Sequence, residues 1–183
     1  MKQGIAMAWL AGSLLLTGCA SETVFRPATT GSASRQDQPF NVSGRISVNM
    51  DGKGSVGQFD WAHRLQDDQL SVNSPLGSTV ARLQRDASGV SLQADGKTWQ
   101  AADVESLTQD VLGWTLPLGN LVWWIRGLPA PDTPYQFAAD GSLAQQGWTI
   151  RFVSDADAPS PYPKRVDMQR DRLTLRLLPQ NWH

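Results

Sequence analysis

The sequence is poor in the residues on which most catalytic and metal sites depend. Its 183 residues include one cysteine, which excludes an internal disulfide, and two histidines, of which His183 is the last residue. A Gly-x-Ser-x-Gly nucleophile motif, a His-Glu-x-x-His metal motif and a Gly-x-x-x-x-Gly-Lys-Ser/Thr phosphate loop are absent. We therefore expect no catalysis, no metal or other cofactor and no nucleotide hydrolysis. His63 is interpreted as an ordinary surface or strand-end histidine.

Charge of one sign and long hydrophobic runs are lacking as well. The chain has 17 acidic and 16 basic residues, a formal net charge of −1. Proteins that bind nucleic acid normally carry a basic face, so this balance argues against a nucleic-acid partner. The main apolar run, residues 5–16, is shorter than the roughly 20 residues that a membrane-spanning helix needs.

That apolar run is typical of a secretory signal peptide. Lys2 supplies the positive start, and residues 5–16 form the hydrophobic region that follows it. The run ends in Leu16-Thr17-Gly18-Cys19, which looks like a bacterial lipobox: a branched apolar residue, two small residues and a cysteine that can carry a lipid. We expect residues 1–18 to be removed and Cys19 to be acylated. The alternative is an ordinary signal peptide with an incidental cysteine.

The segment after Cys19 indicates the destination and the attachment. Ala20 replaces the aspartate that favours inner-membrane retention in known lipoproteins, which suggests the outer membrane. More than one acyl chain is needed for stable anchoring. Residues 20–39 are rich in Ser, Thr, Ala, Gly and Gln without an apolar period, so we expect residues 19–39 to be a lipidated flexible tether.

The remaining residues, 40–183, are expected to form one mainly β domain. Residues 42–50 alternate apolar and polar side chains, as in a half-buried strand, and Asp51-Gly52 then gives a hairpin signal. Regular spacing of about ten such segments favours a meandering antiparallel sheet or barrel. The other expected strands are marked by Phe59 and Trp61; Leu70 and Val72; residues 79–84; residues 90–94; residues 97–100; residues 135–138; residues 143–146; residues 148–152; Val166 and Met168; and residues 173–177.

Two helices interrupt this β pattern. The first is expected over residues 103–112 with Asp103 as its N-cap, and the second over residues 117–126, started by a proline. The second has one apolar stripe, and Trp123 falls on nearly the opposite side. Such a helix is either buried between two ordinary core faces or is a lid that borders a lipid-filled cavity.

The turn Ser74-Pro75-Leu76-Gly77 is a second candidate site. Proline at its second position and glycine at its fourth predict a tight turn, which places Leu76 near a hairpin tip. Leu76 either folds back onto the core or is exposed. An exposed leucine inserted into a bilayer could contribute up to about 3 kcal/mol.

Several motifs, in order, resemble the LolB family of outer-membrane lipoprotein receptors. They are Cys19 in its lipobox, Ser-Gly-Arg-Ile-Ser (43–47), Phe-Asp-Trp (59–61), Asn-Ser-Pro-Leu-Gly-Ser-Thr (73–79), Gly-Trp-Thr-Leu-Pro-Leu (113–118), Trp-Trp-Ile-Arg-Gly-Leu-Pro (123–129), Trp-Thr-Ile (148–150) and Leu-Thr-Leu-Arg-Leu (173–177). The resemblance implies an incomplete antiparallel β-barrel of about ten to eleven strands, with helices covering a hydrophobic cavity.

The resemblance also implies an activity and its partners. The protein would be a monomer anchored on the periplasmic face of the outer membrane. It would accept lipoproteins from the periplasmic carrier LolA and insert their acyl chains into the inner leaflet without ATP. Membrane delivery would depend on the loop of Pro75, Leu76 and Gly77. The implied cavity and lid residues are Ile46, Val48, Phe59, Trp61, Leu118, Leu121, Trp123, Trp124, Ile125, Trp148 and Ile150.

Other functions remain open from the sequence. A structural or assembly-scaffold envelope lipoprotein is the main alternative, and a lipoprotein hydrolase would need a polar cleft for which the chain offers no triad. Family members can also carry a helix before the first strand. The segment 26–39 is short and polar here, which leaves the presence of that helix open.

Overall fold

One antiparallel sheet contains all the strands in the part of the chain that the structure describes. The structure is a computed structural model, and it describes residues 23–25, 37–158 and 160–183. Its 12-stranded sheet follows the order β7-β6-β5-β4-β3-β2-β12-β11-β10-β9-β8, with β1 paired to β10 outside this path. The strands are β1 (Thr23–Val24), β2 (Phe40–Met50), β3 (Lys53–Arg64), β4 (Asp67–Asn73), β5 (Thr79–Asp86), β6 (Gly89–Ala94), β7 (Lys97–Ala101), β8 (Tyr135–Phe137), β9 (Leu143–Gln145), β10 (Trp148–Ser154), β11 (Arg165–Arg170) and β12 (Leu173–Trp182).

The strands form because their apolar residues alternate, and tight turns set their register. Asp51 and Gly52 join β2 to β3, and both have positive φ, at 53° and 81°. This is the backbone that a two-residue hairpin turn requires, which explains the Asp-Gly pair. β12 pairs with β2 and so brings the last strand beside the first long one.

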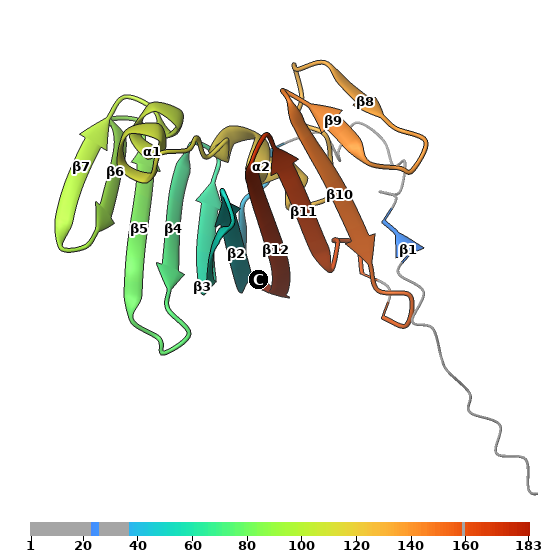
Figure 1. The fold of residues 1–183 in the computed structure, drawn as a ribbon, viewed down its shortest axis with the longest axis horizontal. Coiled ribbons are helices and arrows are strands. Elements are labelled where there is room, and N and C mark those ends of the chain that lie inside the picture. Colours follow the sequence, from blue (N-terminus) through green and yellow to red (C-terminus); the bar gives the residue numbers. More distant parts are fainter. Residues whose placement is uncertain (1–22, 26–36, 159) are drawn as a thin grey trace, which may run out of the picture.

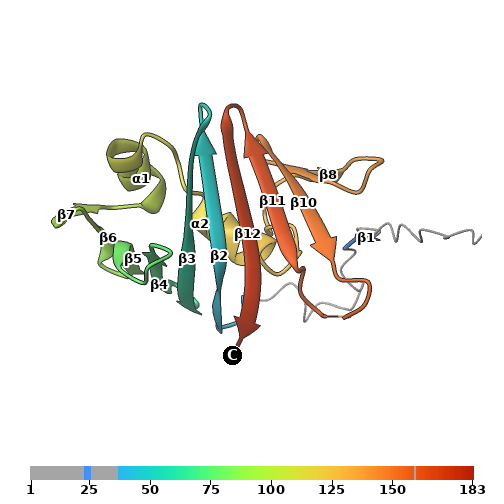
Figure 2. The same ribbon diagram turned by 60° about the horizontal axis from the view of Figure 1, so that its bottom comes forward.

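The sheet curves but does not close. Its outer strands are β7 at one end and β8 at the other, and no pairing joins them in the described residues. The predicted incomplete barrel is therefore confirmed. Figures 1 and 2 show that both helices lie on the concave side of this curved sheet.

The first helix, α1 (Val104–Leu112), begins and ends where the sequence predicts. The Asp103 carboxylate accepts a hydrogen bond from the Ser106 amide at 2.7 Å, and Gly113 ends the helix in a left-handed conformation with φ 78°. The second helix, α2 (Leu118–Trp124), is shorter than the predicted 117–126. Its last turn tightens, since the Gly127 amide bonds the Trp124 carbonyl at 2.9 Å instead of continuing the helical pattern.

Part of the segment predicted to be a flexible tether pairs with the sheet. Thr23 and Val24 pair with the end of β10, and the Phe25 amide donates to the Phe152 carbonyl at 3.1 Å. Phe25 is buried against Gly127, where an added Cβ would lie 2.3 Å from the phenyl ring. The signal peptide, Cys19 and residues 26–36 lie outside the described residues, and so does most of the region in which a preceding helix was considered.

The described helices are short. Helix α1 has 9 residues and α2 has 7. In the described part of the chain, no helix combines the length and the apolar character needed to cross a membrane.

Candidate functional site

The concave side of the sheet and helix α2 share one apolar cluster. It contains every residue predicted to line the cavity and its lid, although those residues come from strands and a helix far apart in the sequence. Ile46 and Val48 are partly buried, and the others are buried: Phe59, Trp61, Leu118, Leu121, Trp123, Trp124, Ile125, Trp148 and Ile150. The structure therefore brings these side chains together, while their role as acyl-chain contacts stays a prediction.

Helix α2 is buried except at Gly119, which is exposed, and Asn120, which is partly buried. Leu118 and Trp124 are fully buried, and Trp123, on the other side of the helix, is also buried. The Trp124 and Trp148 rings lie 6.1 Å apart and join α2 to β10. This packing fits both alternatives for the helix, an ordinary core element or a closed lid.

The side chains of this cluster are buried or partly buried against one another. Two open depressions, of about 410 and 390 Å³, lie elsewhere, over β5–β7 and beside β8–β10. Of the predicted cavity residues only Trp148 borders one of them.

Gln145, which the sequence analysis did not single out, connects α2 to the sheet. Its side-chain oxygen accepts hydrogen bonds from the Trp124 indole at 2.8 Å and the Ala130 amide at 2.9 Å. Its nitrogen donates to the carbonyls of Ala130 at 2.8 Å and Thr133 at 3.1 Å. Gln145 is two residues after Leu143 in β9, so both side chains point to the buried side of the sheet. A polar residue at such a position needs buried hydrogen-bond partners, and this signal in the sequence could have identified Gln145.

Arg126 places a positive charge just after the end of helix α2. It is 7% exposed, and its guanidinium carbon lies 4.7 Å from the Trp123 ring centre and 5.9 Å from that of Phe40. Nε donates to the Val122 carbonyl at 3.0 Å, and one Nη atom has no hydrogen-bond partner in the described part of the chain. Burial lowers the pKa of Arg126, and the charge of Asp37 opposes that effect. Contacts with aromatic faces partly replace the lost water.

The expectation for His63 was wrong in one respect: it lies near the end of β3 but is fully buried. Its Nδ1 lies 2.9 Å from an Asp68 oxygen and its Nε2 lies 2.8 Å from an Asp37 oxygen. The Trp61 indole donates to the same Asp68 oxygen at 2.7 Å, and Arg85 forms an ion pair with the other oxygen. A buried charge needs such partners, which explains how this polar group fits in an apolar sheet.

His63 and Asp68, the two central groups of this buried polar cluster, have shifted pKa values. Burial alone would lower the pKa of His63, but hydrogen bonds to Asp68 and Asp37 outweigh it and raise that pKa above 6.5. Burial alone would raise the pKa of Asp68, but bonds from His63 and Trp61 and the charge of Arg85 lower it below 3.8. Both shifts favour the charged pair in the folded protein.

We expect the folded protein to lose stability as the pH rises above neutral. The raised pKa of His63 stabilises the fold fully below its unfolded value of 6.5, and this stabilisation disappears as the pH passes the folded value. The His63→Gln variant removes the charge-assisted bonds, so its free energy of unfolding should be about 3 kcal/mol lower at pH 6 and less dependent on pH. Urea unfolding between pH 6 and 9 measures this. Equal pH dependence in both proteins would contradict the assignment.

The loop between β4 and β5 exposes Leu76. The Gly77 amide donates to the Ser74 carbonyl at 2.9 Å and Gly77 has φ 89°, so the predicted tight turn is confirmed. Leu76 is 95% exposed, which excludes the alternative that it folds back onto the core. Figure 1 shows this loop projecting beyond the ends of β4 and β5.

The fold and site together describe an open antiparallel half-barrel with an apolar interior covered by helices. The family model described as "Outer membrane lipoprotein LolB" matches residues 38–182. The chain therefore belongs to the LolB family of outer-membrane lipoproteins.

Two relatives compared by sequence agree with this assignment. The chain is 59% identical over 170 residues to an outer-membrane lipoprotein LolB from Chromobacterium violaceum, covering 93% of this chain and 94% of the relative. It is 35% identical over 184 residues to one from Thiobacillus denitrificans, covering 97% and 94%. A crystal structure of a LolA superfamily protein from Nitrosomonas europaea has a TM-score of 0.45 and 8% identity, covering 85% of this chain and 93% of that one.

Proposed function

We propose that this protein accepts lipoproteins from the periplasmic carrier LolA and inserts them into the outer membrane without ATP or any catalysis. The observation that carries the proposal is the apolar interior under α2, combined with the exposed Leu76 at the tip of a strand loop. The first can receive acyl chains, and the second can contact a bilayer. Family membership agrees with both roles.

Acyl chains would occupy the space that α2 fills in the closed protein. Each CH₂ moved out of water contributes about 0.8 kcal/mol, so a lipid chain can replace the packing of Trp123 and Trp124 when the helix moves away. The hydrogen bonds that must break for α2 to move include the one from the Trp124 indole to Gln145 and the one from the Asn120 side chain to that of Gln146. Opening and closing exchange one apolar contact for another. The transfer of an acyl chain can therefore lower the free energy without nucleotide hydrolysis.

The other parts of the proposal concern position and partners. Cys19 carries the lipid anchor, the protein acts as a monomer, and Pro75, Leu76 and Gly77 form the membrane-delivery loop. The interior holds acyl chains more tightly than the carrier does but less tightly than the bilayer, which sets the direction of transfer.

A transfer assay with purified components tests this proposal. A labelled lipoprotein bound to the carrier is mixed with this protein in vesicles, with and without ATP. We expect complete transfer to the vesicles without nucleotide, and no transfer into vesicles that lack this protein. A requirement for ATP at this step, or equal transfer without the protein, would overturn the proposal.

The scaffold alternative predicts a different cellular result. Depletion of a receptor should strand many different lipoproteins in the periplasm, whereas depletion of a scaffold should leave their localisation unchanged. Fractionation of depleted cells separates the two.

A further inference from the structure

The outward face of the sheet carries more exposed apolar surface beside the Leu76 loop. Val56 is 68% exposed and Val80 is 47% exposed. Successive side chains of β3 point to opposite faces of the sheet. Phe59 and Trp61 point inward, and Val56, an odd number of residues from both, points outward. Val80 lies where the β4–β5 register shifts, between Thr79, which pairs with Asn73, and Ala81, which pairs with Val72, and its side chain is half exposed.

The strand register places these valines on the two sides of the loop. Gln58 pairs with Asn73 at the end of β4, and Asn73 pairs with Thr79 at the start of β5. Val56 and Val80 therefore lie on the strands that flank the base of the loop with Leu76 at its tip. Single exposed apolar residues are ordinary, but a group of them around a fully exposed leucine marks an interaction surface.

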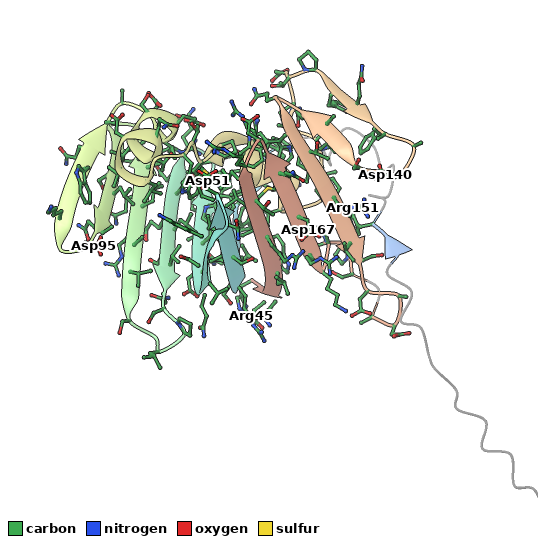
Figure 3. All side chains as sticks on the ribbon, viewed as in Figure 1. Arg45, Asp51, Asp95, Asp140, Arg151 and Asp167 are labelled. Atoms are coloured by element: carbon green, nitrogen blue, oxygen red, sulfur yellow. The ribbon has the colours of Figure 1, made fainter. Side chains whose placement is uncertain are left out.

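Unpaired positive charge borders the same surface. Arg45 pairs with Gln58 across β2 and β3, and Arg82 follows Val80 by two residues on the outward face of β5. Neither arginine has a carboxylate partner in the described residues, whereas Arg176 forms an ion pair with Asp167 at 2.5 Å and Arg151 one with Asp140 at 3.0 Å. Figure 3 shows Arg45 pointing away from the helices, toward the side from which the β4–β5 loop projects.

An acidic residue also lies on this face, but its carboxylate is already engaged. Asp60 accepts a hydrogen bond from the Asn73 side chain at 3.1 Å, and Asn73 in turn accepts one from Thr79 at 2.9 Å. This hydrogen bond leaves the Asp60 carboxylate charged, and Asp95 and Lys97 line the depression beside Val80 and Arg82 with one charge of each sign. With Arg45 and Arg82 the positive charges of this group exceed the negative charges by one. Apolar side chains surrounded by cations fit a bilayer with anionic headgroups, which attracts arginine at short range.

We propose that Val56, Val80, Arg45 and Arg82 extend the Leu76 loop into a membrane-contact surface that selects anionic phospholipid. The valines enter the headgroup and acyl boundary beside Leu76, and the arginines bind lipid phosphates at its border. This inference rests on the proposed function, because it supplies the surface through which delivery occurs.

Nitroxide labelling of the lipidated protein in vesicles tests the proposal. The chain has one cysteine, Cys19, and its thiol is taken up by the lipid, so Val56→Cys or Val80→Cys introduces the free thiol to be labelled. Phe137→Cys, on β8, is the matched control at an exposed apolar position away from the loop. Vesicles contain phosphatidylcholine alone or with phosphatidylglycerol.

We expect the nitroxides at positions 56 and 80 to be shielded from a water-soluble paramagnetic relaxation agent in anionic vesicles. In zwitterionic vesicles the shielding should be much weaker. The label at 137 should stay accessible in both. Adding Arg45→Gln and Arg82→Gln should lower the ratio of docked to undocked protein about fivefold for each arginine. Labels at 56 and 80 that remain as accessible as the control, or that are equally shielded in both vesicle types, overturn the proposal.

The same preparations separate this inference from the proposed function. If lipoprotein transfer from the carrier proceeds normally while positions 56 and 80 stay accessible, only the membrane-contact surface is wrong. If the unaltered protein fails to transfer lipoprotein at all, the proposed function itself is wrong.

Discussion

The Leu76→Glu variant should accept lipoprotein from the carrier normally but deliver it to vesicles at least tenfold more slowly. Leu76 is 95% exposed and makes no core contact, so the change should leave the free energy of unfolding within about 0.5 kcal/mol of the original. Insertion of a leucine into a bilayer contributes up to about 3 kcal/mol, and a carboxylate at the same depth is unfavourable. Stopped transfer assays that quantify receptor-bound and vesicle-bound lipoprotein separately measure both steps.

Leu65→Glu is the matched control for this variant. Leu65 is 57% exposed in the turn between β3 and β4, at the opposite end of β4 from Leu76. The Leu65→Glu variant should deliver lipoprotein at the same rate as the unaltered protein. Normal delivery by Leu76→Glu, or an equal loss in Leu65→Glu, would show that the loop leucine has no special part in membrane contact.

The Gln145→Leu variant should lose about 4 kcal/mol of unfolding free energy. Leucine has a similar volume, but it leaves the Trp124 indole and the polar backbone groups of Ala130 and Thr133 without their partners. Each buried group left unsatisfied costs about 1–3 kcal/mol, although some will find water after relaxation. Urea unfolding followed by tryptophan fluorescence measures the change.

Gln136→Leu provides the comparison, because Gln136 is an exposed residue of β8. It should change the free energy of unfolding by less than about 0.5 kcal/mol. A similar, small effect of both substitutions would mean that Gln145 does not hold α2 to the sheet.

The sequence predicted the sheet well because its signals are local. Alternation in residues 42–50 and the Asp51-Gly52 turn each depend on neighbouring residues, and so does the Asp103 cap of α1. The exposure of Leu76 was left open, since a turn pattern fixes the backbone but not the direction in which its side chain packs.

The buried polar cluster could not be predicted because its members meet only through strand register. His63 lies opposite Asp68 in the β3–β4 pair, and Asp68 lies opposite Arg85 in the β4–β5 pair. Nothing in the sequence near His63 shows this alignment. Once the turns fix the register, the charged row across the strands follows.

The contact between Phe25 and Gly127 escaped prediction for a similar reason. Phe25 is an isolated aromatic residue in a polar segment, and its partner lies about a hundred residues later. Composition alone therefore favoured a free segment from Cys19 to the first long strand.

The pairing of Thr23 with Ser154 shortens the segment that joins the proposed lipid anchor to the folded domain. Four peptide units separate Cys19 from Thr23 and reach at most about 14 Å, whatever their path. With the acyl group on Cys19, as proposed, this edge of the sheet cannot drift away from the bilayer. Figure 1 shows β1 and the β4–β5 loop on opposite flanks of the sheet. The protein would thus contact the membrane at two separate points, the anchor beside β1 and the β4–β5 loop. Two such contacts restrict its tilt and keep one face toward the lipid.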